Sequence, residues 1–187
     1  MDKLIHKINK LISDKKRIII AIEGGCASGK TTLANKLSEI YDANVIHMDD
    51  FFLPFSMRTK ERLKEIGGNI DYERFKKEVA DNVINSTPFT YGVFDCSVGK
   101  INKTVTVEPK KINIIEGVYS KHPLYNDIYD FSIFLKIDSV EQIRRLTARS
   151  PEKIERFINE WIPKENEYFS EFKIQKKCEL VIDILKT

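Results

Sequence analysis

The residues with the clearest chemical use form a glycine-rich run that ends in lysine and threonine. The segment 24–31 has the sequence GGCASGKT, which satisfies the pattern GxxxxGK[ST] of loops that bind nucleotide phosphates. Glycines let successive N–H groups converge on phosphate oxygens, while Lys30 would reach the β- and γ-phosphates and Thr31 would ligate Mg²⁺. The predicted phosphate site comprises Gly24, Gly25, Cys26, Ala27, Ser28, Gly29, Lys30, Thr31 and Thr32.

Two aspartates, Asp49 and Asp50, directly follow the apolar run 44–48. Because ligands bind outside the carboxyl ends of parallel strands, these acids would face the phosphate loop. A carboxylate there accepts the proton of an attacking hydroxyl or holds a water on Mg²⁺, whereas a turn or a helix N-cap is the structural alternative. The preceding His47 has no base or metal partner that the sequence reveals, and we assign it no role.

A further acid, Glu116, ends the apolar run 111–116. An enzyme with a phosphate loop needs a carboxylate at this edge of the sheet for its metal. Asp138 competes for that role, but it begins the sequence Asp-Ser-Val-Glu, and such a capping box explains it structurally. The sequence therefore favours Glu116, together with Thr31, as the metal-binding pair.

Arginines gather on the helix predicted over 140–149. Arg145 and Arg149 are four residues apart on one face, and Arg144 lies beside them. Planar guanidinium groups suit the charge spread over a phosphoryl group during transfer, which makes Arg145 and Arg149 candidate catalytic residues. A solvated basic face is the alternative for any one of them. A proline follows and breaks the helix, so we expect this region to form a lid.

The acceptor side of the site is less sharply marked. Asp71 opens the helix predicted over 71–85, where it would either cap the helix or hydrogen-bond a polyol. Tyr91 and Cys96 belong to the segment 89–107, whose two short β-like runs predict a hairpin that stands off the main sheet. Its aromatic residues either pack or offer a stacking surface to a planar base. We expect the hairpin to act as a substrate-specific flap.

Strands alternate with helices along the rest of the chain. Apolar and β-branched runs predict strands at 17–23, 44–48, 111–116, 131–137 and 179–184. Helical spacing predicts helices at 31–41, 71–85, 140–149 and 152–169. The pattern predicts an α/β fold, the three-layer P-loop NTPase fold, with a mostly parallel central sheet, helices on both faces, a small β-hairpin flap and a helical lid.

A length of 187 residues predicts a single domain over 1–187. Within it we expect an N-terminal helix over 1–16, the substrate flap over 89–107 and a lid region over 144–156. The first segment has an apolar stripe at helical spacing. Docking of this helix on the domain is favoured over binding to a membrane surface.

Composition excludes several classes of protein. The net charge of +3 is too small and too evenly mixed to make nucleic acid the main partner. Three widely spaced cysteines without a CxxC pair argue against zinc and fit a reducing compartment. The apolar runs are too short for a membrane span, and the charged first residues do not resemble a signal peptide. We therefore expect a cytoplasmic location.

Several motifs, in this order along the chain, resemble the uridine kinase family, which also includes nicotinamide riboside kinases and phosphoribulokinases. They are the loop 24–32, MDDFF at 48–52, the segments 71–75 and 105–109, IIEG at 114–117 and the arginine helix. The resemblance covers about residues 17–184. It implies transfer of the γ-phosphoryl group of ATP, with Mg²⁺, to a primary hydroxyl, commonly the 5′-hydroxyl of a ribonucleoside. The family often forms homo-oligomers, although the sequence shows no self-complementary patch.

The resemblance also implies roles for individual residues. Asp49 matches the catalytic base, Glu116 the metal-linked acid and Asp71 the carboxylate that holds ribose hydroxyls. The arginines match lid residues that stabilise phosphoryl charge, and Tyr91 matches a base-contacting tyrosine. The substrate-binding set that follows is Asp49, Asp71, Tyr91, Cys96 and Arg144.

The acceptor stays open because the sequence departs from uridine–cytidine kinases. Cys96 stands where that group has a histidine that contacts the pyrimidine, and the DDFF sequence at 49–52 is closer to nicotinamide riboside kinases. A uridine- or cytidine-type kinase is the main expectation, with nicotinamide riboside or another small molecule as the alternative acceptor. A non-catalytic, nucleotide-gated regulatory module is the alternative from another class. The strand-ending Glu-Gly and the flap favour chemistry over that module.

Overall fold

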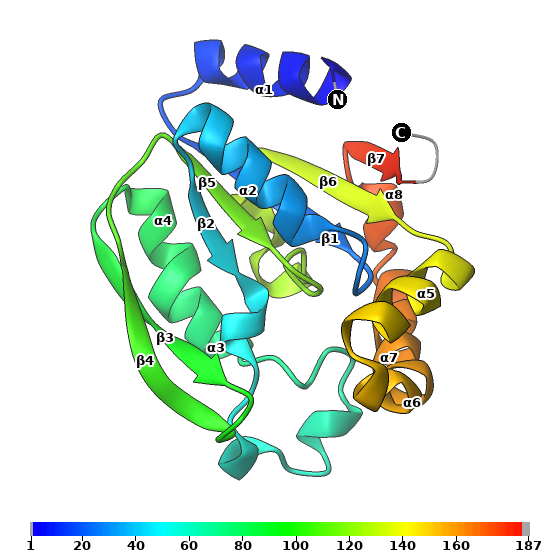
Figure 1. The fold of residues 1–187 in the computed structure, drawn as a ribbon. Coiled ribbons are helices and arrows are strands. Elements are labelled where there is room, and N and C mark those ends of the chain that lie inside the picture. Colours follow the sequence, from blue (N-terminus) through cyan, green and yellow to red (C-terminus); the bar gives the residue numbers. More distant parts are fainter. Residues whose placement is uncertain (1, 185–187) are drawn as a thin grey trace.

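A parallel sheet runs through the centre of the computed structural model, which describes residues 2–184 (Figure 1). Its strands are β1 (Ile18–Gly24), β2 (Asn44–His47), β5 (Ile112–Glu116), β6 (Phe131–Lys136) and β7 (Leu180–Asp183). They lie in the order β2-β5-β1-β6-β7, and all neighbours are parallel. The predicted strands are therefore confirmed, with bounds shifted by at most one residue.

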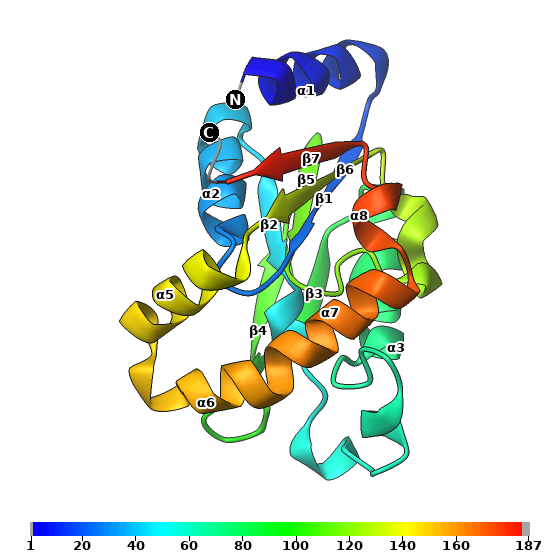
Figure 2. The ribbon, with the colours of Figure 1, turned by 90° about the vertical axis from the view of Figure 1, so that its right-hand side faces the viewer.

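Helices connect the strands and cover both faces of the sheet (Figure 2). They are α1 (Asp2–Asp14), α2 (Lys30–Tyr41), α3 (Tyr72–Phe75), α4 (Asp81–Asn85), α5 (Ser139–Arg149), α6 (Ile154–Arg156), α7 (Ile162–Glu171) and α8 (Ile174–Lys177). No helix within residues 2–184 has both the length and the apolar character that crossing a bilayer requires.

Each face of the sheet has its own apolar core. On one face, α1 and α2 pack against β1 side chains that include Ile18, Ile20 and Ile22. On the other face, the segment from α3 to α4 and the helices α7 and α8 pack against a second cluster that includes Ile19 and Phe134. Because successive strand residues point to opposite faces, one run of isoleucines serves both cores. This arrangement confirms the three-layer α/β fold.

Two of the predicted helices contain a widened turn. The segment predicted over 71–85 changes to a π-helix at Lys76–Ala80, and the one predicted over 152–169 does so at Phe157–Trp161. Pro163 explains the second, because proline has no N–H to donate to the carbonyl four residues earlier. In the first, the side-chain amide of Asn82 donates to the carbonyl oxygens of Lys77 and Glu78, at 2.9 and 3.1 Å.

A separate antiparallel hairpin consists of β3 (Phe89–Asp95) and β4 (Lys100–Val107). It lies outside the main sheet beside α3 and α4 (Figure 1). Most β3 residues are buried, whereas β4 is exposed except for Val107. The register shifts between Val93 and Phe94, which bends the ribbon near its turn.

Candidate active site

The loop between β1 and α2 curls around the side chain of Lys30. Gly24 and Gly29 have φ angles of 142° and 93°, a region that favours glycine. A Cβ atom on Gly24 would lie 2.5 Å from the carbonyl oxygen of Leu135 in the neighbouring strand β6. The Lys30 ammonium is buried and donates to the carbonyl oxygens of Gly24 and Gly25, at 2.8 and 3.0 Å. The loop thus keeps a positive charge at its centre.

A carboxylate and a hydroxyl meet beside this loop, where β5 ends and α2 begins. The Thr31 hydroxyl donates to Oε1 of the buried Glu116 at 2.9 Å. His47 Nδ1 lies 2.6 Å from the same oxygen, and this hydrogen bond raises the pKa of His47. The structure thus brings Thr31 and Glu116 together. The expectation that His47 has no partner is wrong, because β2 pairs with β5 in a register that places His47 beside Glu116.

Asp49 lies in the 3₁₀ turn Met48–Phe51 that follows β2. Its carboxylate is open to solvent, yet protein surrounds it closely enough that the loss of water raises its pKa. The charge of Lys30 opposes that rise and the charge of Glu116 adds to it. Asp49 is therefore within electrostatic reach of both groups at the carboxyl edge of the sheet.

The predicted lid arginines take different positions. Arg145 donates to the carbonyl oxygen of Ala27 in the phosphate loop, at 3.3 Å. Both Arg144 and Arg145 pair with Glu141: Arg145 through Nε at 2.7 Å, and Arg144 through two hydrogen bonds of 2.6 and 2.7 Å. The Arg144 side chain is 68% exposed. Arg149 lies over the ring of Phe157. Of these three, Arg145 alone contacts the loop in the described part of the chain.

Two side chains that the sequence did not single out for binding contact Cys26 in the loop. Gln142 from α5 donates to its carbonyl oxygen at 3.0 Å, and Glu165 from α7 accepts its backbone N–H at 2.9 Å. Both side chains are buried. Glu165 lies three residues before the buried Tyr168, on the inner face of α7. An acid at a position with the spacing of core residues is the feature of the sequence that could have identified Glu165. Burial raises the pKa of the Cys26 thiol to about 12, so that thiol is neutral.

Another buried acid, Glu23, lies immediately before the loop. Its carboxylate accepts backbone N–H groups of Gly24 and Lys121, both at 3.1 Å, and the hydroxyl of Tyr168 at 3.0 Å. Burial raises the pKa of Glu23 to about 7, although these three donors oppose the rise. The Glu23 carboxylate thus holds the end of β1 in place by accepting hydrogen bonds from backbone N–H groups.

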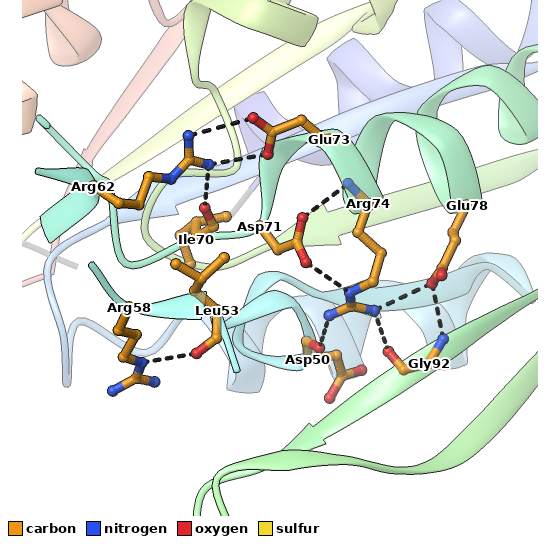
Figure 3. A network of polar contacts seen from close by, with 10 residues as sticks. All are labelled: Asp50, Leu53, Arg58, Arg62, Ile70, Asp71, Glu73, Arg74, Glu78 and Gly92. Carbon is orange, nitrogen blue, oxygen red and sulfur yellow. Dashed lines mark hydrogen bonds and ion pairs between the residues drawn. The ribbon is translucent and has the colours of Figure 1, made fainter. Parts of the chain in front are cut away.

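Arg74 connects three segments of the region predicted to bind the acceptor (Figure 3). Its guanidinium donates to the carbonyl oxygens of Asp50 and Gly92, each at 2.7 Å, and to the Glu78 carboxylate at 3.1 Å. Asp71 caps α3 by accepting the backbone N–H of Arg74 at 3.1 Å, and its other oxygen lies 3.5 Å from Arg74 Nε. Of the two expectations for Asp71, the structure contains the helix cap.

The two predicted base contacts on the hairpin differ in exposure. Tyr91 is buried, packs 5.3 Å from Phe51 between ring centroids and donates its hydroxyl to Asp50 at 3.2 Å. This corresponds to the packing alternative for Tyr91. Cys96 is exposed near the turn of the hairpin. Partial burial of its thiol raises the pKa of Cys96, the charge of Asp49 adds to the rise and the charge of Arg58 opposes it. Cys96 therefore lies close enough to Asp49 to be affected by its charge.

The chain is similar to several curated uridine kinases. The enzyme of Chlamydia pneumoniae is 33% identical over 141 residues, which cover 71% of this chain and 63% of that enzyme's own length. The enzyme of Anoxybacillus flavithermus is 26% identical over 175 residues, covering 82% of this chain and 81% of that enzyme. These matches support placing the chain in the uridine kinase family. No family model matches it.

Solved structures agree with the uridine kinase family in fold. A Bacillus stearothermophilus structure, described as a possible uridine kinase, has a TM-score of 0.71 and 22% identity and covers 97% of this chain and all of that one. A D-glycerate 3-kinase from Cryptococcus neoformans has a TM-score of 0.54 and 16% identity, with 80% and 78% of the two chains covered. The similarity to curated uridine kinases supports a phosphotransferase that acts on a hydroxyl group.

The donor set near the phosphate loop suits the magnesium nucleotide of a uridine kinase-like enzyme. Mg²⁺ prefers oxygen ligands and is usually held by one or two protein groups together with substrate phosphates. The Thr31 hydroxyl and the Glu116 carboxylate, 2.9 Å apart, are such groups. No cluster of three or more His, Cys, Asp or Glu side chains within residues 2–184 forms a protein-only metal cage. Thr31 and Glu116 therefore fit a Mg²⁺ ion that binds together with the nucleotide.

Proposed function

We propose that this chain is an ATP-dependent nucleoside kinase, which transfers the γ-phosphoryl group of ATP to the 5′-hydroxyl of a uridine- or cytidine-type ribonucleoside. The observation that carries the proposal is the placement of three groups at one edge of the sheet. They are the Lys30 ammonium inside its loop, the Thr31–Glu116 pair and the solvent-open Asp49. These are a phosphate-binding cation, oxygen ligands for a metal and a proton acceptor.

Binding of ATP would use the loop and the first turn of α2. Lys30 would exchange its contacts with the Gly24 and Gly25 carbonyl oxygens for phosphate oxygens. Thr31 and Glu116 would hold Mg²⁺, which neutralises charge on the phosphates when bound. Arg145 lies against the loop at Ala27 and would add positive charge beside the phosphoryl group.

Asp49 would act on the acceptor. As the acceptor oxygen bonds to the γ-phosphorus, the bond from that phosphorus to the bridging oxygen breaks and ADP leaves with the electron pair. The hydroxyl proton moves to a carboxylate oxygen of Asp49. A raised pKa improves Asp49 as a proton acceptor, and Lys30 favours its ionised form. The remaining catalysis is positioning and charge stabilisation.

A second acceptor class, nicotinamide riboside or another small molecule, is supported by the exposed Cys96. It takes the place of the histidine that uridine–cytidine kinases direct at the pyrimidine, so the usual contact to the base is missing. Losing a polar contact of this kind changes selectivity strongly. A cytoplasmic location and a homo-oligomeric state remain predictions.

The direct test is ADP release with Mg²⁺·ATP and a panel of acceptors: uridine, cytidine, nicotinamide riboside, D-glycerate and a blank without acceptor. We expect one ribonucleoside to stimulate ADP release strongly and to appear as its 5′-monophosphate by mass spectrometry. Stimulation by D-glycerate alone would mean that the acceptor is a sugar acid and not a nucleoside. Equal release with every acceptor and with the blank would contradict the kinase proposal and favour a regulatory ATPase module.

A further inference from the structure

The carboxylate of Glu165 is placed unusually for a buried acid. It lies on α7, which passes close to the loop between β1 and α2 (Figure 2), and it accepts the Cys26 N–H at 2.9 Å. Its residue is 7% exposed. No lysine, arginine or histidine within residues 2–184 forms an ion pair with Glu165. A buried carboxylate without a salt-bridge partner is costly, so its charge calls for an explanation.

The N–H that Glu165 takes belongs to the phosphate loop. Loops of this kind bind phosphates through successive backbone N–H groups and through the lysine that follows. Here Lys30 is engaged by the carbonyl oxygens of Gly24 and Gly25, while the Cys26 N–H is engaged by a carboxylate. Groups of the protein itself thus occupy both the Lys30 ammonium and the Cys26 N–H, the two kinds of group through which such a loop binds phosphate.

The charges of Lys30 and Asp49 both act on Glu165. Burial raises the pKa of Glu165, the charge of Lys30 opposes that rise and the charge of Asp49 adds to it. Glu165 therefore shares the field of Lys30 and Asp49. Any polyphosphate that reached Lys30 would bring several negative charges close to this carboxylate, and like charges at short range repel strongly where water is scarce.

A structural role alone does not explain the charge. Gln142 already links Cys26 to α5 by donating to its carbonyl oxygen at 3.0 Å. A glutamine at position 165 could accept the Cys26 N–H through its amide oxygen as well as glutamate does. The additional property of glutamate is its negative charge, which resembles that of a phosphate oxygen.

We propose that Glu165 is an internal competitor for the nucleotide polyphosphate, bound to the Cys26 N–H when the loop is free and displaced when ATP binds. The inference rests on the nucleotide site of the proposed function, but it concerns ATP binding alone. In a two-state equilibrium, only the open loop binds ligand. The apparent Kd is therefore the Kd of the open loop divided by the fraction of molecules in which the loop is open. Removing the charge of Glu165 should therefore tighten ATP binding.

The test is calorimetric titration of β,γ-imido-ATP with Mg²⁺, without any acceptor, into the full chain and its variants. We expect Glu165→Gln to bind this analogue about fivefold or more tightly than the natural chain, within the usual range of such couplings. Glu165→Ala should also bind more tightly. Glu167→Gln, an exposed acid on the same helix, should bind as the natural chain does.

Equal or weaker binding by Glu165→Gln would overturn the proposal and make Glu165 a fixed support of the loop. Glu165→Gln keeps the shape and the hydrogen bond, so it decides the matter even if Glu165→Ala unfolds, and a thermal melt verifies that it is folded. Because no acceptor is present, failure of this test is distinguishable from failure of the kinase proposal, which depends on phosphorylation of an acceptor.

Discussion

Asp49 combines two properties that a general base needs. Its carboxylate is open to solvent and thus accessible to a substrate hydroxyl, while the surrounding protein raises its pKa. Its neighbour Asp50 differs, because its carboxylate accepts a hydrogen bond from the buried Tyr91. Two adjacent aspartates therefore have different uses, and the environment rather than the residue type distinguishes them.

Replacing Asp49 by asparagine should reduce kcat by about 10²- to 10⁴-fold, the usual contribution of a positioned base, and should leave ATP affinity within about twofold. The control is Asp50→Asn, whose amide oxygen can still accept from Tyr91 and which should keep most activity. In the natural chain, kcat/KM should fall as the pH is lowered through the raised pKa of Asp49, because protonation removes the base. Turnover of Asp49→Asn within tenfold of the natural chain would remove Asp49 from the reaction.

Some of the site's residue pairs could be predicted and others could not. Thr31 and Glu116 were accessible to prediction, since a phosphate-loop motif and an acid at a strand end are local patterns. The contact of His47 with Glu116 depends on β2 lying next to β5, which is a property of strand order and not of local sequence. For the same reason the sequence did not reveal Glu165, which contacts a residue 139 positions away.

At the scale of elements, α1 is held by a narrow apolar stripe. Leu4 and Ile8 are almost completely buried, whereas the charged residues of the helix are exposed. The stripe packs into the cluster formed by α2 and one face of β1. Most of the stability of such a helix comes from this packing and little from helix propensity.

Replacing Ile8 by alanine should therefore lower the free energy of unfolding by about 2–4 kcal/mol, because it removes buried methyl groups and leaves a cavity. The matched control is Ile40→Ala on α2, where the side chain is 59% exposed and the change should stay within about 0.5 kcal/mol. Urea denaturation measures both. Similar losses for the two variants would mean that α1 does not dock as described.

The strands were more predictable than the long helices. The strand Ile18–Gly24 is rich in β-branched isoleucine and ends in glycine, so sequence and fold agree at the level of the element. The helix around Pro163 shows the opposite case, because its apolar spacing continues across a residue that cannot complete the regular hydrogen bonds. Periodicity identified the segment but not its widened turn.

For the whole molecule, strand order is what assembles the site. The central strand β1 lies between β5 and β6, and β2 follows on the far side of β5. The carboxyl ends of β1, β2 and β5 consequently bring the phosphate loop, Asp49 and Glu116 to one edge. Alternation of strands and helices predicted the α/β class, whereas the spatial order of the strands depends on how the crossovers run and could not be derived from local patterns.

The central claim is that this edge binds a nucleoside triphosphate through Lys30, and titration of Mg²⁺·ATP into the natural chain and Lys30→Ala tests it most directly. Lys36→Ala, an exposed lysine on the same helix, is the control. A hydrogen bond to a charged group contributes roughly 1.5–3 kcal/mol, so Lys30→Ala should weaken ATP binding by about tenfold or more while Lys36→Ala binds normally. Equal ATP affinity for the natural chain and Lys30→Ala would contradict the account.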